Sequence, residues 1–117
     1  DEEKSFYEKV IAFIENNVKD TELSVEMISE SLGCTTQEFY TRLKGITKKT
    51  PNEIIRAYRL SVVERLLVST NLSVEDIIVR VGFGSRSSFF KLFMQEHGMT
   101  PKNYREQQKK MLLKSIW

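Results

Sequence analysis

Two stretches of the sequence place polar side chains on one face of a helix, opposite two large apolar residues. Phe39 and Leu43 in the first stretch, and Phe89 and Phe93 in the second, are four residues apart, so each pair is expected to face the core from one side of a helix. The outward residues are Thr36, Gln37, Tyr40, Thr41 and Lys44 in the first stretch, and Arg86, Ser87, Ser88, Phe90 and Lys91 in the second. None of these outward residues is acidic, which suits a polyanionic partner.

The residue types on these faces match the hydrogen-bonding groups that bases expose in the major groove of DNA. A glutamine such as Gln37 can pair with adenine through two hydrogen bonds, and an arginine such as Arg86 can pair with guanine. Serine and threonine hydroxyls suit either base, and Phe90 could contact a thymine methyl group. On one helix this pattern fits a solvated surface equally well, so its occurrence twice is what favours base recognition.

Each stretch is the second half of a repeated unit. LSVEMISESLG (23–33) aligns without a gap with LSVEDIIVRVG (72–82), 49 positions later. TTQEFYTRLKGITKKTP (35–51) then aligns with SRSSFFKLFMQEHGMTP (85–101), after one extra residue. Thr35 and Ser85 are the expected N-caps of the second helices and belong with the candidate DNA-binding residues. The unit reads as helix, glycine turn, helix, so a duplicated helix-turn-helix is the simplest description.

One long helix is expected between the two units, from Thr50 to Thr70, with Pro51 at its first position. Its apolar residues form two stripes, one of Ile55, Tyr58, Val62 and Leu66 and the other of Ala57, Leu60, Val63 and Leu67. Two apolar stripes predict a helix shared by two lobes. At 1.5 Å per residue it would span roughly 28 Å, which suits two second helices about 34 Å apart, one turn of DNA.

The ends of the chain complete an all-α prediction of about seven helices. Residues 5–18 predict a helix with Ser5 as its cap and with Phe6, Val10, Phe13, Ile14 and Val18 at helical spacing. PKNYREQQKK predicts a closing helix with Tyr104 inward, whereas no structure is predicted for MLLKSIW. The expected organisation is a first lobe at 5–49, a linker helix at 50–70, a second lobe at 71–108 and a tail at 109–117.

Charge and composition indicate where a nucleic acid would bind. Residues 1–33 hold nine acidic and three basic side chains, and residues 34–117 hold seven and fifteen, so the net charges are −6 and +8. A single cysteine, Cys34, is typical of a reducing compartment, and the sequence shows neither a signal peptide nor an apolar run long enough for a membrane span. We therefore expect a cytoplasmic domain without membrane contact. Because the first residue is Asp, the sequence also reads as part of a longer protein.

Catalysis has little support in the sequence. Cys34 and His97, the only residues of their types, lie more than sixty positions apart without an evident orienting group. One cysteine and one histidine also fall short of a metal site, and no cofactor is expected. The GFG at 82–84 lacks both the preceding strand and the following GK[ST] of a phosphate loop. A protein-binding helical module and a non-specific DNA binder remain as alternatives; the first would expose apolar residues and the second would show little base preference.

The stretch VGFGSRSSFFKLFMQEHGMTPKNYR (81–105) strongly resembles the second helix-turn-helix signature of the AraC/XylS family of bacterial transcription regulators. KKTPNEIIRAYRLSVVERLL resembles the family's linker helix, and residues 23–47 resemble its first helix-turn-helix. The spacing of TTQEFYTRLKGITKKTPNEII looks most like members at the output end of hybrid two-component sensors. Thr41 and Met94 depart from the arginine and lysine that are common in the family at these positions.

The resemblance implies a sequence-specific DNA-binding domain that regulates transcription, with double-stranded DNA and RNA polymerase as partners. It also implies a fused sensing or dimerising domain outside this sequence. The family's base-reading positions map onto Thr36, Gln37, Tyr40 and Thr41, and onto Arg86, Ser87, Ser88 and Lys91. Because the two helices differ in sequence, the expected site consists of two unlike half-sites.

Overall fold

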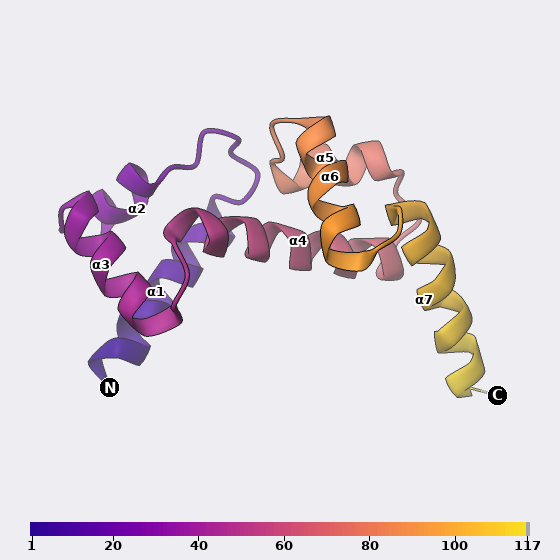
Figure 1. Cartoon of the computed structure of the whole chain (residues 1–117), viewed down its shortest axis with the longest axis horizontal. Coiled ribbons are helices and arrows are strands. Elements are labelled where there is room, and N and C mark those ends of the chain that lie inside the picture. Colours follow the sequence, from indigo (N-terminus) through magenta and orange to yellow (C-terminus); the bar gives the residue numbers. More distant parts are fainter. Residues whose placement is uncertain (117) are drawn as a thin grey trace. The chain divides into compact units, whose positions relative to one another are not determined.

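The computed structural model describes residues 1–116 and is all-helical within them, as predicted (Figure 1). Its helices are α1 (Glu2–Asn16), α2 (Val25–Ser31), α3 (Thr36–Thr47), α4 (Pro51–Ser69), α5 (Val74–Val81), α6 (Arg86–His97) and α7 (Pro101–Ile116). No helix in residues 1–116 is long and apolar enough to cross a membrane. The chain divides into two compact units, Asp1–Tyr58 and Arg59–Trp117, so that the boundary lies within α4.

The first unit packs α1, α2, α3 and the beginning of α4 around a single core. Its buried side chains are Phe6, Val10, Ile14, Leu23, Ile28, Phe39, Leu43, Ile54 and Ile55. The rings of Phe6 and Phe39 lie 6.1 Å apart and join α1 to α3. The predicted N-cap at Ser5 is wrong: α1 begins earlier because the Asp1 carboxylate accepts a hydrogen bond from the Lys4 amide at 2.8 Å.

The second unit is built on aromatic rings. Phe89 and Phe93 of α6 are fully buried, and Phe93 contacts both His97 and Tyr104, so Tyr104 faces inward as predicted. Burial raises the pKa of the Tyr104 hydroxyl, and the negative charge of Glu64 adds to the rise. The end of α4 is held to α7 by Arg105, which donates from Nε to the Leu67 carbonyl (2.8 Å) and from Nη2 to the Leu72 carbonyl (2.6 Å).

Two further predictions about helices need correction. Ala57 was expected in an inward stripe of α4 but is exposed, whereas Ile54 is buried in the first unit. A methyl group buries little surface, so exposing Ala57 costs little, whereas a buried isoleucine gains much more. The segment 111–116, for which no structure was predicted, continues α7, with Met111, Leu112, Leu113 and Ile116 exposed on it.

The backbone repeats along with the sequence. In the first turn the Cys34 amide donates to the Ser29 carbonyl at 3.1 Å, and in the second the Phe83 amide donates to the Ile78 carbonyl at 3.2 Å. Both turns use a glycine with positive φ, Gly33 in the first and Gly82 in the second. The second helices end alike as well, although the left-handed residue after α3 is Lys48 (φ 64°) and the one after α6 is Gly98 (φ 67°). The two units therefore contain the same helix-turn-helix.

Candidate nucleic-acid interface

The start of α3 is fixed by reciprocal capping. The Thr35 hydroxyl oxygen accepts a hydrogen bond from the Glu38 amide at 3.1 Å, and the Glu38 carboxylate accepts one from the Thr35 amide at 3.2 Å. This capping box pairs donors that the first turn would otherwise leave without partners. It holds the first turn in place, and the candidate residues Thr36 and Gln37 belong to that turn.

The candidate residues of α3 share the solvent-facing side of the helix. Phe39 and Leu43 are fully buried, while Thr36, Gln37, Thr41 and Lys44 are exposed and Tyr40 is 40 % exposed. The Lys44 ammonium lies 5.8 Å from the centre of the Tyr40 ring, so these two side chains form one basic and aromatic surface. The structure thus gathers the first predicted set on one accessible face.

Glu38 is a polar residue of this face that the sequence reasoning left out. It lies in the first turn of α3, is exposed, and shares a shallow hollow with Gln37, Thr41 and Arg42. The signal for it was present, because threonine followed three residues later by glutamate is the sequence pattern of a capping box. Since its carboxylate accepts from the Thr35 amide, part of its hydrogen-bonding capacity is already used.

The start of α6 is capped without an acidic residue. The Ser85 hydroxyl oxygen accepts from the Ser88 amide at 3.2 Å and lies 3.4 Å from the Ser87 hydroxyl. Arg86, Ser87, Ser88 and Lys91 are all exposed, as predicted. Phe90 differs, because it is only partly exposed: its ring packs 5.2 Å from that of Phe89, and the Arg86 guanidinium lies 4.8 Å from its centre.

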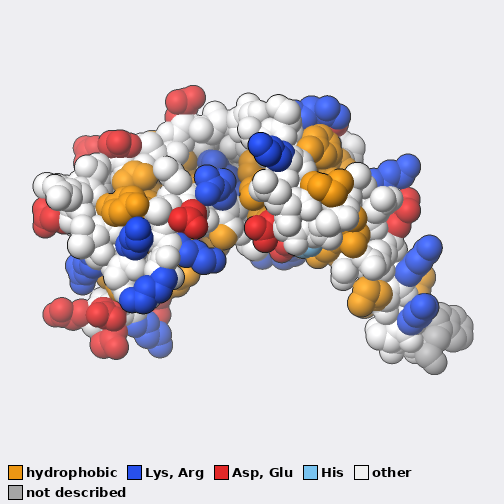
Figure 2. Space-filling view, in the orientation of Figure 1, with side chains coloured by type: hydrophobic (Ala, Val, Ile, Leu, Met, Phe, Trp, Pro, Cys, Tyr) orange, Lys and Arg blue, Asp and Glu red, His pale blue; other side chains and the backbone are white. Residues whose placement is uncertain are grey.

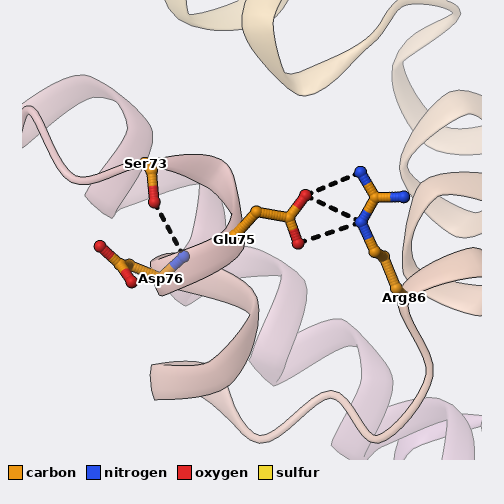
Figure 3. Close-up of polar contacts among 4 residues, drawn as sticks. All are labelled: Ser73, Glu75, Asp76 and Arg86. Atoms are coloured by element: carbon orange, nitrogen blue, oxygen red, sulfur yellow. Dashed lines mark hydrogen bonds and ion pairs between the residues drawn. The ribbon is translucent and has the colours of Figure 1, made fainter.

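Arg86 also makes a contact that sequence spacing does not reveal. Its Nε lies 2.8 and 3.0 Å from the two carboxylate oxygens of Glu75 in α5, and its Nη2 lies 2.7 Å from Oε1 (Figure 3). The hydrogen bond from Arg86 holds the pKa of the Glu75 carboxyl below its ordinary range. The two residues are eleven positions apart and meet only because the turn folds α6 back on α5.

The remaining candidate groups for chemistry have structural partners. His97 Nε2 lies 2.7 Å from the Glu64 carboxylate and its ring packs against Phe93 and Tyr104. Cys34 is half-buried in the first unit, with its sulfur 3.7 Å from the Ser29 carbonyl oxygen. Within residues 1–116 no group of three potential ligands could hold a metal ion.

Lysine and arginine side chains are exposed on both units (Figure 2), so a polyanion has cationic groups to bind on each.

Known proteins are similar to this chain in sequence and in fold. A family of helix-turn-helix domains matches residues 28–107. The transcriptional activator RhaS of an Enterobacter species is 30 % identical over 98 residues, which are 84 % of this chain and 35 % of RhaS. Histidine kinase P4 of Formosa agariphila is 28 % identical over 102 residues, 87 % of this chain but 7 % of the kinase. The DNA-binding domain of AdpA, solved in complex with a target DNA, superposes with a TM-score of 0.80 at 22 % identity and covers 87 % of this chain and 91 % of that one.

The fold and its two exposed second helices define a double helix-turn-helix domain of the kind found in DNA-binding transcription regulators. The chain belongs to the AraC-type helix-turn-helix family. It spans only a small part of the two relatives' own lengths, 35 % of RhaS and 7 % of the kinase.

Proposed function

We propose that the chain binds double-stranded DNA in a sequence-specific manner and places a bacterial transcription regulator on its promoter. In this proposal α3 and α6 enter successive major grooves. The observation that carries it is that α3 and α6 occupy equivalent places in two like-folded units and expose hydrogen-bonding residues in their first turns. On the opposite side each helix buries two large apolar residues, Phe39 and Leu43 in α3 and Phe89 and Phe93 in α6. A buried face fixes each helix, and an exposed face leaves its side chains available to base edges.

The proposed roles follow from side-chain chemistry. Gln37 pairs with adenine and Arg86 with guanine, each through two hydrogen bonds. Thr36, Thr41, Ser87 and Ser88 contact base edges or phosphate oxygens, and Lys44 and Lys91 supply positive charge to the backbone. Tyr40 adds a phenolic hydroxyl, while the capping residues Thr35 and Ser85 hold the helix ends that approach the phosphates.

The regulator as a whole would be larger than this domain. RhaS is an activator and P4 is a histidine kinase, and this chain matches only part of each. We infer that a sensing or dimerising domain is fused to it, that it is the output end of a two-component system, and that it acts on RNA polymerase from the cytoplasm. The linker helix would set two unlike half-sites about one turn apart.

Selection from a random-sequence DNA pool tests the proposal. It is run at near-physiological salt, because at low salt the attraction to phosphates of any sequence dominates binding. Enrichment of a motif with two unlike halves is expected. On that motif Gln37→Ala should cost about 1 to 3 kcal/mol and Arg86→Ala should weaken binding about 5- to 150-fold. The matched controls Gln107→Ala and Arg65→Ala, at exposed positions outside α3 and α6, should bind like the wild type.

The other outcomes separate the alternatives. Equal losses on the motif and on scrambled DNA would refute the base-reading roles. Binding without an enriched motif, with a steep salt dependence, would identify a non-specific binder. If no DNA bound at any salt concentration, a protein partner would become the better explanation of the exposed faces.

A further inference from the structure

The contact between Glu75 and Arg86 links the first helix of the second helix-turn-helix to its proposed base-reading helix. Both side chains are mostly exposed, 57 % and 66 % respectively. Exposed ion pairs contribute little to folding stability, since water and salt screen them. This pair differs from a single-contact ion pair because Arg86 Nε donates to both carboxylate oxygens while Nη2 lies 2.7 Å from Oε1, and because it engages the arginine at the exposed start of α6.

The geometry leaves one edge of the guanidinium available. Glu75 lies along the side edge, where Nε donates to both carboxylate oxygens and Nη2 lies 2.7 Å from Oε1. The terminal edge, formed by Nη1 and the second hydrogen of Nη2, is the edge that can donate two parallel hydrogen bonds to the O6 and N7 atoms of guanine. Arg86 can therefore keep its bond to Glu75 while it reads a base.

The guanidinium is held on a second side as well. Its carbon lies 4.8 Å from the centre of the Phe90 ring, and Phe90 is itself packed on the buried Phe89. A long arginine side chain otherwise loses rotamer freedom when it binds, and this loss subtracts from affinity. Contact with a carboxylate along one edge and with a ring on one face removes much of that freedom before DNA arrives.

We propose that Glu75 is a positioning residue that directs the terminal edge of Arg86 toward a guanine and raises discrimination at that base pair; this rests on the function proposed above. The carboxylate also offsets the arginine's charge, so that Arg86 gains less from phosphates of any sequence. Glu75 thereby lowers affinity for DNA of any sequence and raises discrimination at the base pair that Arg86 reads. It contacts no DNA in this role.

The chain supplies two matched controls. Asp76 is an exposed carboxylate at the next position of α5, and its side chain points away from Arg86 (Figure 3). Glu26 is the repeat equivalent of Glu75 in the first unit, where Thr36 occupies the position of Arg86. Asp76→Asn and Glu26→Gln thus remove one negative charge each without removing a carboxylate–guanidinium pair.

The experiment measures Kd for the full chain on its selected site, on sites substituted at each base pair, and on scrambled DNA, at several salt concentrations. Arg86→Ala first identifies the base pair that Arg86 reads. At that base pair Glu75→Gln should reduce discrimination on the order of 10-fold, the size of coupling seen between residues in contact. Affinity for scrambled DNA should rise, with the salt slope steeper by about 1. The two controls should shift all affinities together and leave discrimination unchanged.

A double-mutant cycle makes the test specific to the pair. Glu75→Gln added to Arg86→Ala should change discrimination no further, and thermal unfolding should confirm that each variant is folded. Unchanged discrimination in Glu75→Gln would overturn the inference while the proposed function stands. Increased discrimination would also overturn it, because Glu75 would then be withholding Arg86 from DNA. If the wild type discriminates no base pair, the proposed function and this inference both fail.

Discussion

Replacing Arg105 with alanine should destabilise the second unit more than any change on the proposed DNA-binding faces. The guanidinium donates to two backbone carbonyls, that of Leu67 in the last turn of α4 and that of Leu72 before α5. Carbonyls in the last turn of a helix have no partner within the helix. Arg105 therefore satisfies a helix end and holds the following loop at the same time.

The magnitude follows from the number and burial of these bonds. A hydrogen bond to a charged group contributes about 1.5 to 3 kcal/mol, and an unpaired buried acceptor retains its desolvation cost. Leu67 is fully buried, so water cannot replace the lost donor at its carbonyl, whereas Leu72 is only half-buried. We expect Arg105→Ala to lower the free energy of unfolding by about 2 to 3 kcal/mol, which corresponds to roughly 8 to 12 °C in melting temperature for a domain of this size.

Urea unfolding followed by circular dichroism measures the free energy of unfolding, and amide hydrogen exchange shows which segments lose protection. Protection should fall in the second half of α4 and in α5, where the two carbonyls lie. Lys109→Ala is the matched control, because Lys109 lies one turn further along α7 and donates to the Asn71 side chain in an exposed contact. It should change stability by less than about 0.5 kcal/mol. A loss of that small size for Arg105→Ala as well would refute the reasoning.

Two other predictions concern helix ends. Lys48 occupies a left-handed conformation that its repeat equivalent Gly98 adopts without strain. Lys48→Gly should therefore raise the free energy of unfolding by up to about 1 kcal/mol, and Gly98→Ala should lower it by about as much. Urea midpoints that moved in the opposite directions would contradict this. The Thr50 amide donates to the Glu53 carboxylate at 3.2 Å, and hydrogen bonding from Thr50 holds the pKa of that carboxyl below its ordinary value. The ionised carboxylate therefore stabilises the fold above the unfolded-state pKa, and this effect is lost as pH falls through the lower folded-state pKa. Wild type should therefore exceed Glu53→Gln in urea midpoint at pH 7, and the difference should disappear as pH falls through the folded-state pKa of Glu53. A difference independent of pH would disprove the assignment.

The sequence predicted the helical fold well because its signals are local. Serine or threonine at the start, glycine in the turn and aromatic residues four apart each act within one or two helical turns. The exposed faces of α3 and α6 followed directly from Phe39 and Phe89 being buried. Where the prediction of α4 failed at Ala57, a helical wheel could show a stripe but could not show which members of it meet a partner.

The features that could not be predicted depend on contacts between segments distant in the sequence. The pairing of Glu75 with Arg86 requires the path of the turn between them, and the contacts of Arg105 join residues 33 and 38 positions apart. Neither pairing has a sequence signature, because the presence of a glutamate or an arginine does not reveal which distant residue it contacts. Glu38 is different, because its capping role follows from the local pattern of a threonine three residues before a glutamate.

The duplicated turns have a consequence for how such a domain can change over evolutionary time. In a symmetric dimer, one codon encodes both copies of each recognition residue, so every substitution alters two half-sites at once. Here Thr36 and Arg86 occupy equivalent positions in two like-folded units but are encoded separately. If α3 and α6 both read DNA, one half of the target can drift while the other half keeps the regulator in place.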